Sequence, residues 1–290
     1  MARKNIATVY LEFSLAKLFS FLIKLLPWSL TLRLGQLLGW LVGKFFIKRN
    51  KIARQNLSLV FPEKAEREKS AIIGKVWQNL GQMLVESLKI PQFKKKHFAR
   101  WTTLIGRENV DRALAGGKGV IFLVAHFGNW EMGGAVVSHS GYPLAVIARP
   151  LDNELLNGEV NRIRSCHGAT ILSSRNAVKE SLRWLRNNGV LAILIDQNFY
   201  QGGIFVDFFG RPAATTNIVP LLAAKTGAKI LPIFCRRENG KTVIAIEKEV
   251  EINNLDSVAA TAKLTGIIET WIRRYPKEWF WIHDRWKRKP

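Results

Sequence analysis

Several stretches of strand length are apolar throughout and end abruptly at a polar residue. Residues 120–125 read V-I-F-L-V-A, are rich in β-branched side chains and follow a Gly-Gly-Lys-Gly turn. Residues 144–148 and 190–195 repeat the pattern. Runs of this kind are typical of strands that are buried on both faces, as in a parallel sheet. We therefore expect these segments to form the middle of a sheet.

Stretches with helical periodicity separate these strands. The main predicted helices are residues 65–90, 130–137, 154–167, 176–187, 218–226 and 257–274. Further short strands are expected at residues 169–172, 230–235 and 243–246, the last two joined by a hairpin-like turn. The alternation of strand and helix implies right-handed crossovers. We therefore predict an α/β fold with a mostly parallel central sheet flanked by helices.

Polar residues follow three of the apolar strands directly. His126 follows the first, Arg149 the second, and Asp196 with Gln197 the third. The carboxyl ends of parallel strands meet at one edge of the sheet, which is where ligands bind in open α/β folds. We therefore expect His126, Arg149 and Asp196 to gather at that edge.

The residues after His126 suit a turn and the start of a helix. Gly128 and Asn129 are turn and N-cap residues, and Glu131 falls in the first helical turn. On one continuous helix the His126–Glu131 spacing would put the two side chains about 140° apart. With a turn between them, the carboxylate can hold one ring nitrogen and leave the other free as a general base. The alternative is that His126 merely ends the strand and Glu131 favours the helix N-terminus.

These residues also resemble a known motif. A-H-F-G-N-W-E at residues 125–131 is similar to the H-x-x-x-x-[DE] motif of the lysophospholipid acyltransferase superfamily, in the form found in bacterial lipid A late acyltransferases. Further blocks follow in the order of that family, from about residue 56 to the last residue. They are A-R-P-L-D-N at 148–153, I-D-Q-N at 195–198, F-F-G-R-P-A-A-T-T at 208–216, I-L-P-I-F at 230–234 and W-F-W-I-H-D-R-W-K-R-K-P at 279–290. His283 and Arg285 lie in the last block, and the sequence suggests no role for either.

The resemblance implies a glycerolipid acyltransferase-like fold and an O-acyltransferase, transferring groups other than amino-acyl groups. His126 would take the proton from an acceptor hydroxyl as that hydroxyl attacks a thioester, and Glu131 would hold the imidazole. The implied donor is acyl carrier protein, an acidic partner. The implied acceptor is a phosphorylated glycolipid, a Kdo-bearing lipid A precursor, although similar enzymes acylate other glycolipids, phospholipids or aminolipids.

Arginines are the candidates for substrate binding. Arg149 can bind a phosphate or a developing oxyanion, because a guanidinium fork matches phosphate geometry. Its alternative is a structural salt bridge with Asp152 or Asp196. Arg162 and Arg164 either meet the lipid headgroup or face water.

Three polar residues near the strand ends complete the substrate-binding candidates. Asn129 helps to shape the turn, and Asp196 either touches substrate or orients Arg149. Gln197 is a candidate through its position beside Asp196.

Nucleophilic and metal chemistry have little support in the sequence. There is no G-x-S-x-G nucleophile elbow. Cys166 stands next to His167, but adjacent side chains on a helix point apart. No Cys/His cluster has metal-ligand spacing, so neither a metal nor a cofactor is expected.

The first fifty residues combine apolar helices with basic side chains. Arg3 and Lys4 precede an apolar stretch at 6–27, which Glu12, Lys17 and Lys24 interrupt and no small-residue cleavage site follows. A second apolar stretch at 32–46 leads into a basic cluster of Lys44, Lys48, Arg49, Lys51 and Arg54. Neither stretch has the roughly twenty uninterrupted apolar residues of a clear membrane span. Interfacial helices, one tilted span and a hairpin packed on the domain all remain open.

The net charge supports an anionic partner. The 290 residues carry 44 basic and 22 acidic side chains, a formal charge of +22. A nucleic-acid-binding protein would carry a recognisable binding motif or a basic face with stacking aromatics, whereas here the basic residues flank apolar helices. We therefore predict no nucleic acid partner and an anionic membrane surface at the cytoplasmic leaflet instead. The resemblance implies that this membrane is a bacterial inner membrane. A non-catalytic membrane-binding protein of the same fold is the alternative.

The predicted organisation has two parts. Residues 1–50 form membrane-associating helices, and residues 51–290 form the acyltransferase domain.

Overall fold

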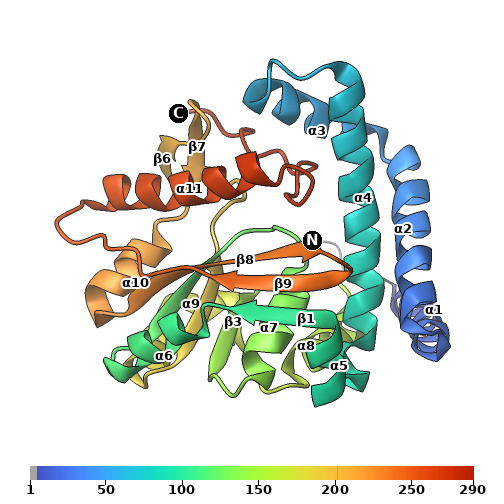
Figure 1. The fold of residues 1–290 in the computed structure, drawn as a ribbon, viewed down its shortest axis with the longest axis horizontal. Coiled ribbons are helices and arrows are strands. Elements are labelled where there is room, and N and C mark those ends of the chain that lie inside the picture. Colours follow the sequence, from blue (N-terminus) through green and yellow to red (C-terminus); the bar gives the residue numbers. More distant parts are fainter. Residues whose placement is uncertain (1–4, 201) are drawn as a thin grey trace.

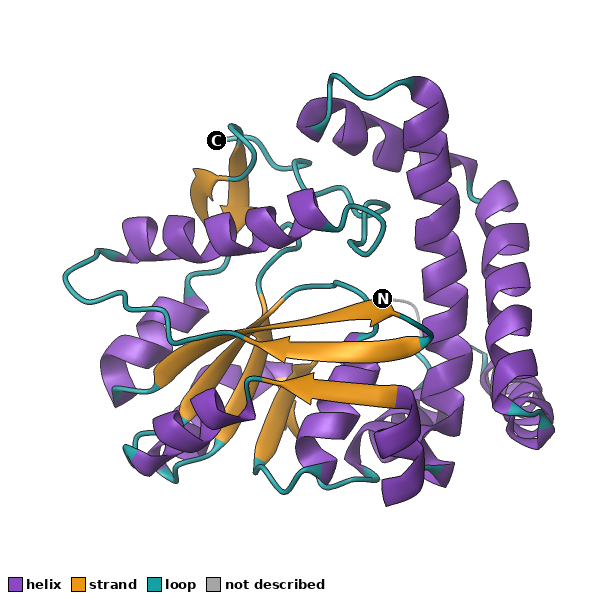
Figure 2. Ribbon diagram, viewed as in Figure 1, coloured by secondary structure: helices purple, strands orange, loops and turns teal. Residues whose placement is uncertain are grey.

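A twisted seven-stranded sheet with helices on both faces forms the centre of the molecule (Figures 1 and 2). The computed structural model describes residues 5–200 and 202–290, so Arg3 and Lys4 lie outside the described residues. The strands of the main sheet are β1 (Thr102–Ile105), β2 (Val120–Val124), β3 (Leu144–Ala148), β4 (Thr170–Ser173), β5 (Val190–Leu194), β8 (Lys229–Glu238) and β9 (Lys241–Ile246). A separate hairpin pairs β6 (Ile204–Asp207) with β7 (Pro212–Thr215).

The order of the strands places β2 at the middle of the sheet. That order is β1-β9-β8-β2-β5-β3-β4, and every neighbouring pair is parallel except β8 and β9. The prediction of a mostly parallel α/β sheet is confirmed, including the antiparallel hairpin near its end.

Eleven α-helices are described in residues 5–200 and 202–290. They are α1 (Ile6–Leu25), α2 (Trp28–Phe45), α3 (Ile47–Val60), α4 (Glu66–Lys89), α5 (Lys95–Trp101), α6 (Arg107–Ala115), α7 (Trp130–His139), α8 (Glu154–Ser165), α9 (Ala177–Arg186), α10 (Ile218–Thr226) and α11 (Ser257–Arg274). The sequence pattern does not predict β1, β6 or β7, because each has only four residues and little alternation.

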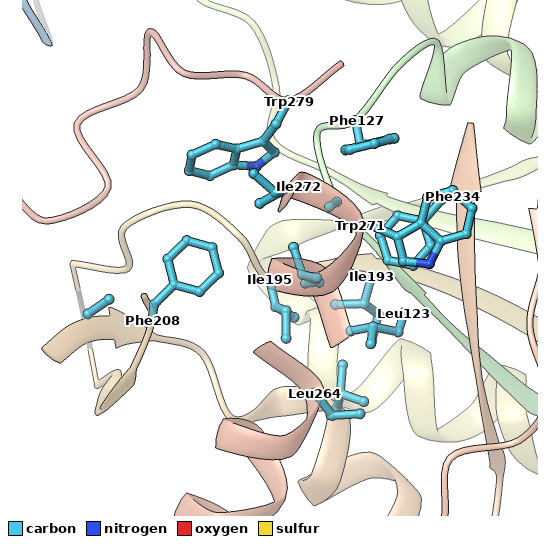
Figure 3. Close-up of a cluster of buried hydrophobic side chains, with 14 of the residues drawn as sticks. Leu123, Phe127, Ile193, Ile195, Phe208, Phe234, Leu264, Trp271, Ile272 and Trp279 are labelled. Atoms are coloured by element: carbon cyan, nitrogen blue, oxygen red, sulfur yellow. The ribbon is translucent and has the colours of Figure 1, made fainter. Parts of the chain in front are cut away.

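Both faces of β2 are buried, which explains its unbroken apolar sequence. Leu123 points to the face covered by α11, where it lies near Leu264 (Figure 3), and Ile121 belongs to the same hydrophobic cluster. Phe122 points to the opposite face and belongs to a second cluster with Val136 of α7. The centre of the sheet therefore has no solvent-facing side, as expected for a parallel sheet.

Glycines allow α2 to pack closely against α4. Gly35, Gly39 and Gly43 recur every fourth residue on one face of α2. A Cβ added at Gly39 would lie 2.0 Å from the carbonyl oxygen of Trp77, and one added at Gly81 would lie 2.1 Å from that of Gly35. Small residues at this spacing let two helix backbones approach each other. The N-terminal helices are therefore fixed to the rest of the chain by backbone-to-backbone packing.

The outer surface of α1 and α2 is apolar and exposed. Its large exposed side chains include Tyr10, Leu11, Leu15, Leu18, Phe21, Leu22, Leu25, Leu37, Trp40, Leu41 and Phe45. By length and composition alone, α1 is able to cross a membrane, with a mean hydropathy of 1.6. The helices α2 and α3 meet that criterion only as a pair, and the chain bends by 93° between them.

Candidate active site

The turn that carries His126 depends on a glycine and an N-cap. Gly128 has a φ of +60°, and a Cβ there would lie only 1.7 Å from the carbonyl oxygen of Cys235, so no other residue fits. The Asn129 side chain accepts from the backbone N–H of Met132 at 2.9 Å and caps α7. The predicted cap is confirmed, and it turns the chain sharply from β2 into the helix.

The C-terminal tail supports this turn from outside. Phe127 and Trp279 form an isolated antiparallel bridge. The N–H of Gly128 donates to the carbonyl of Glu278 at 2.9 Å, and the N–H of Phe280 donates to the carbonyl of His126 at 3.1 Å. The aromatic tail thus extends the backbone hydrogen bonding at the position where His126 must be held.

Asp196 holds the His126 imidazole. Its Oδ1 lies 2.8 Å from His126 Nδ1, and its Oδ2 accepts from the His126 backbone N–H at 2.9 Å. Oδ2 also accepts from the indole N–H of Trp279 at 2.8 Å. The Asp196 side chain is 1% exposed and that of His126 is 23% exposed. The carboxylate is therefore a buried anchor for a histidine that reaches the surface.

These contacts keep Asp196 ionised and set the histidine tautomer. Burial by itself would raise the pKa of Asp196, but the charge and hydrogen bonds of His126, with the hydrogen bond from Trp279, outweigh burial and lower it. An ionised carboxylate only accepts hydrogen bonds, so the proton of a neutral His126 lies on Nδ1. Nε2 then carries the free lone pair, and no hydrogen bond from a described residue engages it.

Glu131 takes a different partner from the one the sequence predicts. Its two oxygens accept from Arg164 Nε at 3.0 Å and Nη2 at 2.5 Å, and this hydrogen bonding raises the pKa of Arg164. No hydrogen bond joins Glu131 to His126 among the described residues. The pairing of the strands explains this difference. β5 is the neighbour of β2, and their register places Asp196 level with His126. Glu131 lies instead within reach of Arg164 on α8.

Arg149 lies at the same edge of the sheet and stands free. The register pairs Val124 with Leu194 and Ala192 with Val146, so His126 and Arg149 leave the sheet at nearly the same level. Two strand spacings separate them, roughly 10 Å. Arg149 is exposed and forms no hydrogen bond or ion pair with a described residue. The alternative of a salt bridge with Asp152 or Asp196 is therefore not formed.

Arg162 is paired on the surface of α8. Its Nε and Nη2 donate to Glu159 at 3.0 and 2.8 Å, and these hydrogen bonds are the main reason that the pKa of Glu159 falls to about 2. Lys17 of α1 lies 3.5 Å from the same carboxylate. Arg162 is thus part of the contact between α1 and α8, which the sequence does not predict.

Asn129 and Gln197 have structural contacts. The Asn129 amide donates to Glu86 at 2.5 Å, and both oxygens of Glu86 accept from Arg237, at 2.8 and 2.6 Å. The carbonyl of Gln197 accepts from Arg285 at 3.1 Å. Both residues lie beside the His126–Asp196 pair and hold the backbone around it.

Two tail residues that the sequence leaves without a role hold the loop after β5. Arg285 is fully buried, donates to the carbonyls of Gln197 and Ala214, and has its pKa lowered to about 10 by burial. His283 Nε2 accepts from the N–H of Asn198 at 2.9 Å, and burial lowers the pKa of His283 to about 4. Their position in a block that resembles the family was the available signal.

Neither cysteine has the surroundings of an activated nucleophile. Burial raises the pKa of Cys166, and raises that of Cys235 to about 12, whereas a reactive cysteine has a lowered pKa. Among the described residues, no group of three or more His, Cys, Asp or Glu side chains is arranged to hold a metal ion.

A sizeable cavity lies away from His126. It has a volume of about 510 Å³ and is lined by α10 and residues 249–257, near Lys229 at the start of β8. A cavity of about 10 Å³ adjoins His126 itself and is lined by Asn79 and Glu278 among others. The chemistry of the site therefore belongs to the open edge of the sheet and not to the larger cavity.

An open α/β sheet whose edge presents a carboxylate-held histidine and a free arginine is suited to acyl transfer without a protein nucleophile. The family model described as bacterial lipid A biosynthesis acyltransferase matches residues 2–288, and the chain belongs to this family. The resemblance seen in the sequence is confirmed, and the protein is an O-acyltransferase.

Curated relatives extend over most of the chain. The chain is 29% identical over 269 residues to the lipid A biosynthesis palmitoleoyltransferase of Escherichia coli K12, covering 91% of this chain and 87% of that protein. It is 29% identical to the lipid A biosynthesis lauroyltransferase of the same strain, with 93% and 89% covered. A phosphatidylinositol mannoside acyltransferase of Mycobacterium tuberculosis CDC 1551 is 26% identical, with 72% and 68% covered.

Proposed function

We propose that this protein transfers a fatty acyl chain from an acyl thioester to a hydroxyl of a lipid A precursor or a related glycolipid. The observation that carries the proposal is the 2.8 Å contact between His126 Nδ1 and Asp196, which leaves Nε2 free at the carboxyl edge of β2. The names of the relatives support the acceptor class, because two are acyltransferases of lipid A biosynthesis and one is a phosphatidylinositol mannoside acyltransferase.

In the proposed reaction His126 works as the general base. Nε2 takes the proton of the acceptor hydroxyl as its oxygen bonds to the thioester carbon. The tetrahedral intermediate then collapses, the C–S bond breaks, and the leaving thiolate takes the proton back from the imidazolium. Asp196 holds the ring and stabilises its positive charge. Because the thioester is already activated, the mechanism needs no protein nucleophile.

Arg149 is proposed to bind a phosphate. It is exposed, makes no hydrogen bond or ion pair with a described residue, and lies roughly 10 Å from His126 across two strand spacings. That separation suits a substrate whose phosphate is bound by Arg149 while its reacting group lies beside His126. A guanidinium binds phosphate through two parallel hydrogen bonds, so it also orients what it binds. Glu131 acts in this scheme through Arg164 and not through His126.

Acyl carrier protein is the proposed donor. The net charge of +22 favours an acidic partner, because opposite charge steers association. The acyl chain of such a donor is attached through a phosphopantetheine arm, which also brings a phosphate to the site.

The proposed location is the cytoplasmic face of the bacterial inner membrane. The exposed apolar surface of α1 and α2 supports membrane contact, through a single span or within the interface. Basic side chains of the adjacent α3 suit an anionic leaflet. The division into a membrane-associating segment at 1–50 and an acyltransferase domain at 51–290 remains part of this proposal.

A reconstituted assay tests the function. The purified protein would receive acyl carrier protein loaded with a fatty acid, together with a lipid A precursor, a phosphatidylinositol mannoside or a lysophospholipid as separate acceptors. Mass spectrometry should detect one added acyl chain on a phosphorylated glycolipid, and His126→Ala should abolish it. Transfer to the lysophospholipid alone would reject the acceptor class, and undiminished transfer by His126→Ala would reject the mechanism.

A further inference from the structure

The helix α1 contacts α8 and the loop before it through polar side chains, and near its end Ser20 and Ile23 are buried. Most of its large apolar side chains are exposed, including Leu11, Leu15 and Leu18. The side that faces the protein carries Glu12, which contacts the loop before α8, and Lys17, which contacts α8 itself. The same helix therefore joins an apolar outer surface to the segment that follows β3.

Asn153 makes the central contact between α1 and this segment. Its Oδ1 accepts from the N–H groups of Leu155 and Leu156, both at 3.1 Å, and so caps α8. Its amide donates to the carbonyl of Val9 at 3.0 Å and to Glu12 Oε2 at 2.9 Å. The residue is 3% exposed. One buried side chain thus uses its acceptor for α8 and its donors for α1.

Further polar contacts hold α1 beyond the Asn153 contact, toward the C-terminal end of the helix. Lys17 lies 3.5 Å from Glu159, which Arg162 also binds. At the end of α1, the Lys89 ammonium of α4 donates to the carbonyls of Ile23 at 3.2 Å and Lys24 at 3.3 Å. These contacts fix α1 against both α8 and α4.

The loop between β3 and Asn153 carries the free arginine. Only Arg149, Pro150, Leu151 and Asp152 separate the end of β3 from Asn153. The N–H of Leu151 donates to Asn157 Oδ1 on α8 at 3.1 Å. The position of Arg149 therefore depends on two supports, the sheet at one end and Asn153 with α8 at the other.

We infer that Asn153 is a positioning residue that couples the membrane-facing helix α1 to the Arg149 loop, so that α1 helps to place the phosphate-binding arginine. The inference rests on the proposed function, since it assigns α1 a part in the reaction beyond attachment to lipid. Loosening the contact should leave the protein folded and bound to vesicles, yet should weaken its use of a phosphorylated acceptor.

Asn153→Asp tests this coupling selectively. An aspartate oxygen still accepts from the N–H groups of Leu155 and Leu156, and an acidic residue is favourable at a helix N-terminus. It cannot donate to Val9 or Glu12, and it places two carboxylates together. The KM for the phosphorylated acceptor should rise on the order of tenfold or more, because small misplacements of binding groups are costly. Two like charges at a buried position also cost stability, so the melting temperature should fall, whereas sedimentation with anionic vesicles should stay near wild type.

A second variant supplies the rescue. In Asn153→Asp with Glu12→Gln, the glutamine amide can donate to the new carboxylate and rebuild the contact with its polarity reversed. The KM should return toward the wild-type value, with Glu12→Gln alone as the reference. Asn161→Asp adds the same charge to α8 at a side chain with no hydrogen bond to a described residue, and should leave KM unchanged.

A failure of this coupling can be told apart from a failure of the proposed function. If the wild-type protein transfers no acyl chain, the proposed function fails. If the wild type is active and Asn153→Asp has a wild-type KM, the coupling is wrong. The coupling is equally wrong if the KM rises only together with lost vesicle binding, or if the double variant recovers the melting temperature without recovering the KM.

Discussion

Asp196 binds His126 at two points, through Nδ1 at 2.8 Å and through the backbone N–H at 2.9 Å. The carboxylate thus holds both the ring and the peptide that carries it. Trp279 supplies a third hydrogen bond from the tail, at 2.8 Å. These hydrogen bonds hold the imidazole in one orientation without any substrate, as a positioned general base requires.

Glu131→Gln should affect stability and activity together. Glu131 binds Arg164 through both oxygens, so the amide variant removes the charge that Arg164 neutralises. We expect a lower melting temperature and a loss of turnover smaller than that caused by Asp196→Asn. Thermal unfolding and steady-state kinetics on the two variants check this. A loss of turnover equal to that of Asp196→Asn, with an unchanged melting temperature, would restore Glu131 to a direct role.

Arg149→Lys and Arg149→Ala should separate binding from structure. Arg149 has no ion pair with a described residue, so neither variant should lower the melting temperature. The Lys variant should lose much of the activity, since an ammonium cannot form two parallel hydrogen bonds with phosphate, and the Ala variant should lose more. Wild-type kinetics in the Lys variant would mean that only charge is used at this position.

His283 predicts how stability depends on pH. Burial lowers the pKa of His283 to about 4 in the folded protein, against 6.5 for an ordinary histidine. Between these values the unfolded chain binds more protons than the folded one, so stability falls as the pH falls from about 6.5 to 4. His283→Gln keeps an acceptor for the Asn198 N–H but cannot titrate.

The expected result is a smaller loss of melting temperature in His283→Gln than in the wild type over the same pH range. Thermal unfolding at intervals of half a pH unit measures it. Parallel curves for the two proteins would show that His283 is not the group responsible.

The exposed face of α1 should bind lipid. Leu15→Glu with Leu18→Glu should weaken binding to anionic vesicles by at least about a hundredfold, since burying each leucine contributes roughly 1.5–3 kcal/mol. Both side chains are exposed, so the melting temperature should not change. Leu255→Glu, at an exposed leucine far along the chain beside the larger cavity, is the control. Equal vesicle binding by both variants would place the lipid contact elsewhere.

The sequence predicts the sheet well because burial leaves a local signal. β2 and β5 are buried on both faces, so their apolar runs identify them without any knowledge of their neighbours. The convergence of His126, Arg149 and Asp196 follows from parallel topology alone. The structure places these three residues at one edge of the sheet.

The partners within the site depend on contacts that no local pattern contains. Whether Glu131 or Asp196 reaches His126 is decided by the register of β2 against β5 and by the position of Arg164. Trp279 reaches Asp196 from 83 residues away, through a bridge with the turn after β2. Side-chain choices of this kind require the lateral order of the strands, which the sequence pattern leaves open.

Asp196→Asn tests the central claim, that Asp196 orients His126 as the general base. In the wild type, Oδ2 accepts two hydrogen bonds, from the His126 backbone N–H and from Trp279. An asparagine must therefore place its carbonyl oxygen there and turn its amide toward Nδ1. The amide donates, so Nδ1 becomes the acceptor and the proton moves to Nε2, where the base is needed.

The measurement is the single-turnover rate of acyl transfer by Asp196→Asn, made beside its melting temperature. The account predicts a rate lower by about 100- to 10,000-fold in a protein that still folds. A rate within about threefold of wild type, well below the typical contribution of a positioned general base, would contradict it.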